Sequence, residues 1–414
     1  MDIIFPLAVF SALGYAIVIA CLRLVAPDEV PAVRRIVLFA MAMRLFVSTV
    51  FGIVPQLRLF HDDADGYEYN GMALAASWAG EGPPLPYASG QNFGFGQVGA
   101  AVYYVFGRYA VVLPYFNSIV GTVTVFFVYV LARKFVHTLV ARRAALLVAV
   151  MPSMILWSSI AIKDPLMTLL IVLCLLFCVR IKEHVGVADF LGAAITLAGM
   201  QRLRFYMVYF VGFAVLASMI LDRGMRLVSG IYKQIVLATV VIGLFALVGL
   251  MGPTEQGTEV LSLERVSAYR SGMATTAESG FSSDVDISSP GRALLFLPVG
   301  MSVLLLGPFP WQMTSLRPIL AAPETVFWWM LFPSMIRGMI LLVRKRFSLV
   351  SPLVLFSMTL ICAYSLVHGN VGSGFRQRAQ IFVFLFIFAS LGTYQKRCQK
   401  AGVDERLLLA PVAG

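Results

Sequence analysis

The chain has 414 residues, of which 59% are hydrophobic and only 13% are charged, and its mean hydropathy is +0.86. This composition excludes an ordinary water-soluble globular protein and indicates a protein of the lipid bilayer. The formal net charge of +11 is distributed over the connections between apolar runs, so membrane topology explains it and we expect no nucleic-acid partner. The five cysteines lie in apolar runs or in a basic tail, which predicts no disulfide framework.

Apolar runs long enough to cross a membrane recur along the chain. The connections rich in arginine and lysine, such as the run Arg344-Lys345-Arg346, are expected in the cytoplasm. This places the amino terminus outside and the carboxy terminus inside. The predicted fold class is an all-α polytopic membrane protein with about 11 transmembrane helices and outer juxtamembrane helices. The predicted spans are residues 3–24, 36–56, 109–132, 140–160, 165–181, 187–201, 205–222, 234–252, 324–343, 348–367 and 378–394.

Two outer segments, residues 57–108 and 253–323, are long, whereas the other connections are short. Long loops commonly carry function. The second segment contains residues 292–312, an apolar stretch interrupted by prolines, which we interpret as a re-entrant or interfacial element; a full crossing is the alternative. We predict that residues 1–414 form a single membrane-embedded domain.

The first outer segment holds a dense cluster of His61, Asp62, Asp63 and Asp65, followed by Tyr67. Carboxylates crowded this closely are suited to taking up a proton or to binding a cation. They are therefore candidates for a general base, and Asp62 and Asp63 could also hold Mg²⁺ or Mn²⁺. The alternative is a solvated loop in which Asp63 or Asp65 caps the helix that follows.

Basic residues at the outer ends of predicted spans form a second candidate group. Asp164 and Pro165 have the pattern of a helix start, and a cation beside that positive helix end indicates an anion site. Arginine suits bidentate phosphate recognition. The alternative is that these side chains extend toward lipid headgroups. The predicted ligands of a lipid phosphate are Lys163, Arg202, Arg204, Arg376 and Arg378.

Arg44 lies near the middle of the predicted span 36–56, where a charge is costly and usually functional. We expect its cost to be relieved by an acidic partner or by extension of the side chain toward the membrane surface.

The stretch Asp62-Asp63-Ala64-Asp65-Gly66-Tyr67 resembles the catalytic acidic element of GT-C glycosyltransferases, especially the protein O-mannosyltransferases and aminoarabinose transferases. Residues 152–164 are similar to that family's segment leading to a basic–acidic pair at an outer helix start, and the resemblance covers about residues 30–225. Unlike the family, the chain has an extra span, 3–24, before the acidic loop.

This resemblance implies a multi-pass enzyme of the plasma (inner) membrane with its active site on the periplasmic or extracellular side. Its donor would be a sugar linked to a polyprenyl phosphate, and its acceptor a glycan, a lipid or a protein. Asp63 would act as general base with Asp62 or Asp65 as its partner, and His61 and Tyr67 would contact substrate.

Two other functions remain open from the sequence. An O-antigen polymerase or ligase would rely on Glu264, Arg265 and Arg270 in the late outer segment rather than on the acidic cluster. A glycolipid transporter or flippase would favour inverted repeats and charges near the bilayer midplane, whereas the sequence shows no repeat and gathers its charges at one surface.

Overall fold

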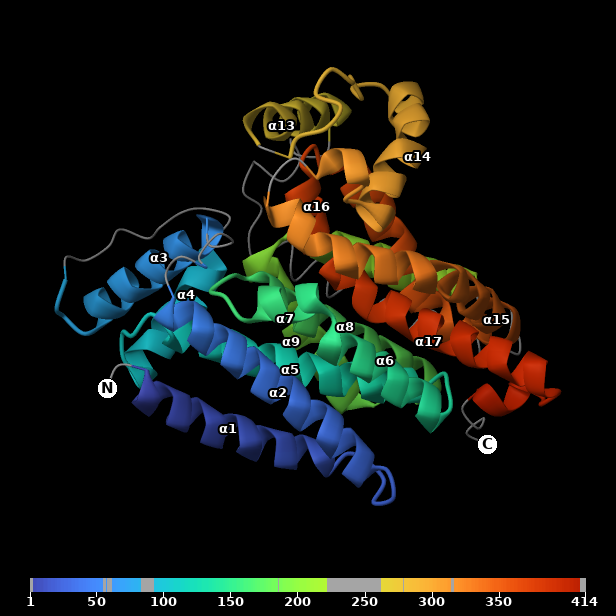
Figure 1. Cartoon of the computed structure of the whole chain (residues 1–414), viewed down its shortest axis with the longest axis horizontal. Helices are drawn as coiled ribbons and strands as arrows, with labels where there is room; N and C mark the ends of the chain where they lie inside the picture. Colours follow the sequence, from blue (N-terminus) through green and yellow to red (C-terminus); the bar gives the residue numbers. More distant parts are fainter. Residues whose placement is uncertain are drawn as a thin grey trace. The chain divides into compact units, whose positions relative to one another are not determined.

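The computed structural model describes residues 3–54, 57, 62–82, 93–184, 186–221, 262–277, 279–313 and 316–409. Their regular elements are all helical, which confirms the predicted all-α class, and within these ranges only isolated β-bridges occur. Figure 1 shows the helices in chain order. The α-helices are α1 (Ile4–Leu22), α2 (Val30–Ile53), α3 (Asp62–Trp78), α4 (Phe93–Phe106), α5 (Val112–Arg133), α6 (Thr138–Val150), α7 (Pro152–Ser158), α8 (Asp164–Glu183), α9 (Val187–Leu203), α10 (Tyr206–Ile220), α13 (Leu263–Thr276), α14 (Pro290–Leu306), α15 (Leu316–Val367), α16 (Val371–Gln377) and α17 (Ala379–Ala401), with short 3₁₀ helices at Pro310–Gln312 and Glu405–Leu408.

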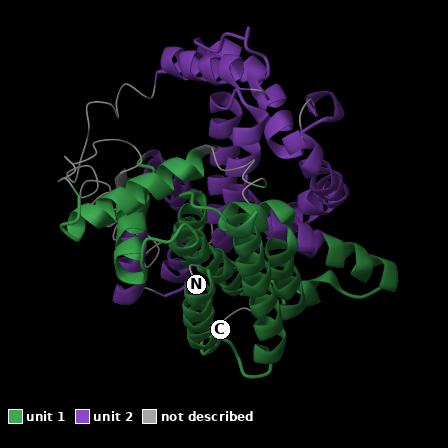
Figure 2. Ribbon diagram, turned by 60° about the vertical axis from the view of Figure 1, so that its left-hand side comes forward, with its two compact units in different colours: residues 1–176, 198–205, 393–414 green, residues 177–197, 206–392 purple. Residues whose placement is uncertain are grey.

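The chain divides into two compact units, which are coloured separately in Figure 2. Unit 1 comprises residues 1–176, 198–205 and 393–414, and unit 2 comprises residues 177–197 and 206–392. The prediction of one membrane-embedded domain stays a prediction.

Unit 1 is built around α5, which contacts α1, α2, α4, α6 and α7. In its most apolar stretch 78% of the residues are buried, against 22% in α1. A helix that is apolar all round and buried all round belongs in the core, whereas the apolar exposed residues of α1 suit contact with lipid. Helix α3, which carries the acidic cluster, packs on α4, and α4 packs on this central helix.

Unit 2 is built on α15, a long helix whose backbone leaves helical geometry at Arg346. It contacts α10, α13, α14 and α16. Trp328 of α15 is fully buried, and its ring centroid lies 4.4 Å from that of Phe382 in α17. The small residues Gly338 and Gly392 let α15 and α17 approach closely, as glycines do where helices cross in a membrane.

The predicted spans are recovered as helices where the structure describes them, but their number as membrane crossings is not confirmed. In the described part of the chain, five helices are long and apolar enough to cross a bilayer, or six if the bent pair α6–α7 counts as one span. The predicted span 234–252 lies outside the described residues. Residues 324–343 and 348–367, predicted as two spans, lie in the two helical stretches of α15 on either side of the non-helical Arg346. Residues 292–312 contain most of α14 and a 3₁₀ turn, and their re-entrant arrangement stays a prediction.

Candidate functional site

The acidic cluster lies at the start of α3. Asp63 and Asp65 are exposed, whereas Ala64 and Tyr67 are buried and face the rest of unit 1. First-turn positions suit carboxylates because the helix dipole is positive there. Because Asp63 and Asp65 are exposed, both acids point away from the packed face of α3, and an incoming substrate can reach them.

His61 and the side chain of Asp62 lie outside the described residues. Within the described part of the chain, no group of three or more histidine, cysteine and acidic side chains could hold a metal ion. A Mg²⁺ or Mn²⁺ site at Asp62 and Asp63 stays a prediction.

Helix α3 is fixed to α4, which lies beside it (Figure 1). The Tyr67 ring meets the Phe95 ring edge to face, with 5.1 Å between centroids. One turn further along α3, a Cβ on Gly71 would lie 3.1 Å from the Tyr103 ring and 3.3 Å from the Gly99 backbone. The two helices thus approach through their glycines, and the acidic turn is held by Tyr67 against the first turn of α4.

The start of α4 packs in turn on the segment that carries Arg202 and Arg204. A Cβ on Gly94 would lie only 2.1 Å from the Arg202 carbonyl oxygen, so α4 touches that backbone directly and only a glycine fits. The Arg202 side chain is exposed. A continuous path of contacts therefore runs from the acidic turn through Phe95 and Gly94 to Arg202.

Arg204 is buried and pairs with Asp164, the first residue of α8, through an Nη2–Oδ1 distance of 2.7 Å. Both side chains are nearly inaccessible to solvent, which makes this a buried ion pair. It ties the Arg202–Arg204 segment to the start of α8, and Lys163, half-buried, is the residue directly before that start. The acidic turn, Arg202 and Lys163 are thus linked within unit 1.

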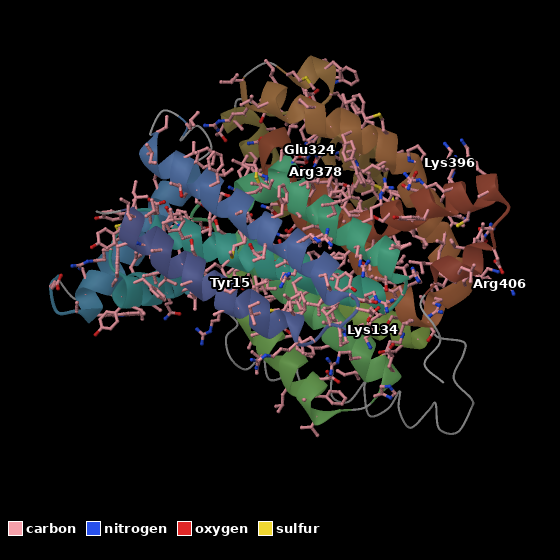
Figure 3. The ribbon with its side chains drawn as sticks, turned by 60° about the horizontal axis from the view of Figure 1, so that its bottom comes forward. Tyr15, Lys134, Glu324, Arg378, Lys396 and Arg406 are labelled. Atoms are coloured by element: carbon pink, nitrogen blue, oxygen red, sulfur yellow. The ribbon has the colours of Figure 1, made fainter. Side chains whose placement is uncertain are left out.

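Arg376 and Arg378 belong to unit 2, at the end of α16. Arg376 is half-buried, whereas Arg378 is buried and donates to the Gly307 carbonyl oxygen at 2.6 Å. Its guanidinium lies 3.8 Å from the Glu324 carboxylate, beside it in Figure 3, and 4.0 Å above the Phe375 ring. Their predicted convergence with the residues of unit 1 stays a prediction.

Sequence reasoning missed the carboxylate partners of two predicted phosphate ligands, Asp164 for Arg204 and Glu324 for Arg378. It assigned Asp164 the start of a helix and the acidic place in the family's basic–acidic pair, but no contact with Arg204. Glu324 stands almost alone among apolar residues, and an isolated carboxylate in such a run is itself a signal of a buried partner. That signal was present in the sequence.

Residues 96–249 match the family model described as dolichyl-phosphate-mannose-protein mannosyltransferase. This match confirms the resemblance to GT-C glycosyltransferases, and it includes Lys163, Arg202 and Arg204. The chain is thus similar to glycosyltransferases that act within a membrane.

Among solved structures, the chain is similar to an archaeal oligosaccharyltransferase, AglB from Archaeoglobus fulgidus, which was solved with an inhibitory peptide and a dolichol-phosphate. The identity is 13% and the TM-score 0.48, over 91% of this chain and 52% of that one, so the chain spans about half the length of that protein. No curated protein sequence matches the chain.

Proposed function

We propose that the protein transfers a sugar from a polyprenyl-phosphate carrier to a glycan, lipid or protein acceptor at the outer face of the plasma (inner) membrane. The observation that carries this proposal is the path of contacts in unit 1 that links exposed Asp63 to Arg202 and Lys163. General-base catalysis needs a carboxylate near the acceptor, and phosphate departure needs cations near the donor.

In the proposed reaction, the Asp63 carboxylate takes the proton of an acceptor hydroxyl. The acceptor oxygen forms a bond to the anomeric carbon of the sugar as the bond from that carbon to the phosphate oxygen breaks. The polyprenyl phosphate leaves as an anion, and Lys163 and Arg202 stabilise the charge that develops on it.

Arg204 acts differently in this scheme. Because its guanidinium is already paired with Asp164, it holds the start of α8 in place rather than presenting an open cation. Asp65 and Tyr67 flank the base, Tyr67 by fixing the acidic turn on Phe95.

Of the three residues on which a polymerase or ligase of the O-antigen type would rely, Glu264 and Arg265 are exposed, whereas Arg270 is out of reach of a substrate. Arg270 is fully buried, and its guanidinium donates to the carbonyl oxygens of Phe281, Ser282 and Val285. It also lies 4.2 Å above the Phe296 ring. This arginine supports the fold of its own segment.

The test is transfer of a radiolabelled sugar from polyprenyl phosphate to membrane acceptors by the purified protein in liposomes. Asp63→Asn is expected to reduce transfer roughly 100-fold or more, the range lost with a general base. Glu81→Gln is the matched control, because Glu81 is an exposed acid of unit 1 that pairs with Arg108. An unchanged rate in Asp63→Asn would exclude the proposal, and glycolipid translocation without any product would indicate a transporter.

A further inference from the structure

The helix break between α6 and α7 leaves backbone carbonyls without their usual partners. The two helices meet at an angle of 60°, and Met151 between them is extended. A residue before proline disfavours helical geometry, and proline has no N–H to donate. The Val148 carbonyl, four residues before Pro152, therefore has no intrahelical donor.

Arg44 of α2 supplies the missing donors. Its Nη2 donates to the Val148 carbonyl oxygen at 3.0 Å, and its Nη1 to that of Ala149 at 3.4 Å. Its Nε donates to the Ser158 hydroxyl, at the end of α7, at 2.9 Å. A buried cation is also well placed at the negative end of α6. Arg44 thus joins the two sides of the break.

Buried side chains also donate to the backbone carbonyls of the residues after the break, from Ser159 to Ile162. Ser48 donates to the Ser159 carbonyl oxygen at 3.0 Å. The Asn117 amide donates to the carbonyl oxygens of Ile160 at 2.6 Å and Ile162 at 2.8 Å. The next residue is Lys163.

We propose that Arg44 is a positioning residue that acts through Lys163. The inference rests on the proposed function and extends it: a polar support buried in unit 1 sets where the phosphate-binding cation stands. Arg44 itself is only 1% exposed, so its guanidinium is not open to a substrate. A displacement of about 1 Å far from the chemistry can cost roughly 100-fold in rate, so the support is expected to affect turnover.

A double-mutant cycle tests this inference with Ser158→Ala, which removes the hydroxyl that accepts from Arg44 but leaves the backbone carbonyls bonded. We expect Ser158→Ala to lower kcat about tenfold in the wild-type background, and less than about twofold in a Lys163→Met background. A support that acts through Lys163 has nothing left to position once that side chain is removed.

Ser365→Ala is the matched control, since Ser365 is a buried serine that donates only within its own helix, to the Ile361 carbonyl oxygen. Its kcat is expected to be unchanged in both backgrounds. If the Ser158 and Lys163 effects multiply, or if Ser158→Ala has no effect on the wild type, the inference is wrong. Loss of transfer in Asp63→Asn together with multiplying effects would overturn only this inference, whereas unchanged transfer in Asp63→Asn would overturn the proposed function.

Discussion

Within the described residues each unit buries two arginines, and Arg44 of unit 1 and Arg378 of unit 2 are accommodated differently. Arg44 in unit 1 is surrounded by backbone carbonyls and a serine hydroxyl, which carry partial negative charges. Arg378 in unit 2 faces the full negative charge of Glu324, one carbonyl oxygen and two aromatic rings. The difference shows that a charge inside this protein can be offset by a broken helix end as well as by an opposite charge, and the two cases leave different groups behind when the arginine is removed.

The largest effect on stability is expected from Arg378→Met. This change leaves Glu324 as a buried carboxylate without the guanidinium that lies 3.8 Å from it. Breaking a buried ion pair costs about 3–5 kcal/mol in unfolding free energy. The loss is measured by unfolding of the detergent-solubilised protein, and the double variant Arg378→Met/Glu324→Gln is expected to recover part of it. A double variant no more stable than Arg378→Met alone would show that the charge of Glu324 does not matter.

Arg44→Met is expected to cost less, about 1–3 kcal/mol, because it leaves neutral carbonyl groups unsatisfied rather than a charge. Arg44→Lys keeps a cation that can reach the carbonyl oxygens of Val148 or Ala149. Its unfolding free energy should therefore lie between those of Arg44→Met and the wild type. The same unfolding measurement ranks all these variants. A loss in Arg44→Met as large as that in Arg378→Met would remove the distinction between the two arginines.

Sequence reasoning predicted the helical class and most of the helices, because long apolar runs allow little else in a bilayer. It expected an acidic partner or an extended side chain for Arg44, whereas the structure gives it the carbonyls of a helix break. The signal was Pro152, which lies within the predicted span 140–160 and removes one donor from it. Reading a span only for hydropathy hides such a break.

The candidate site was predictable only in part. The acidic cluster and the cations at the ends of predicted spans stand out in a chain with few charges, so the sequence alone proposes them as site residues. The contacts that link them are made by Phe95 and Gly94, whose aromatic and small side chains are too common to mark a site. The ion pair between Asp164 and Arg204 joins helices distant in sequence, and no local spacing indicates it.

Two glycines extend the comparison from charge to packing. A Cβ on Gly338 in unit 2 would lie 2.0 Å from the Phe388 carbonyl oxygen, so Gly338→Ala must move α15 away from α17. A Cβ on Gly121 in unit 1 would lie 2.6 Å from the Ser158 Cβ and 2.9 Å from the Arg44 Nε. Gly338→Ala and Gly121→Ala are each expected to cost about 1–3 kcal/mol, as overpacking does, because the Phe388 carbonyl belongs to the backbone and the Ser158 Cβ is bonded directly to it.

Activity distinguishes these two glycine variants further. Gly121→Ala displaces the Arg44–Ser158 contact, so its transfer rate should fall about tenfold at a similar loss of stability. The control is Gly272→Ala in α13, where a Cβ meets nothing within 4 Å and helix propensity predicts a gain of about 0.5–1 kcal/mol. A normal transfer rate in Gly121→Ala would show that the Arg44–Ser158 contact at the helix break does not affect the reaction.

The smallest expected effect is a dependence of stability on pH, and it again differs between the units. Glu29 of unit 1 is buried and accepts hydrogen bonds from the Tyr129 and Thr138 hydroxyls and from Arg133, whose Nη2 lies 3.1 Å away. Burial raises the pKa of Glu29, but these hydrogen bonds and the charge of Arg133 outweigh it and hold the pKa below the ordinary value of 4.5. In unit 2, hydrogen bonds from the Ser288 backbone N–H and hydroxyl hold the pKa of the surface residue Asp286 below 3.8.

A carboxyl whose pKa is lower in the folded state stabilises the fold fully above its unfolded pKa, and this contribution is lost as pH falls through the folded value. The midpoint of unfolding should therefore be level above about pH 5 and fall at lower pH, and Glu29→Gln should flatten part of that fall. Asp286→Asn should flatten it less, because solvent screens a group at the surface. Thermal unfolding of the three proteins from about pH 7 to about pH 3 measures this, with Glu81→Gln as the control for an exposed acid. If Glu29→Gln keeps the full wild-type fall in the unfolding midpoint, other carboxyls cause that fall. The buried contacts of Glu29 would then hold α2 against α5 without contributing to acid sensitivity.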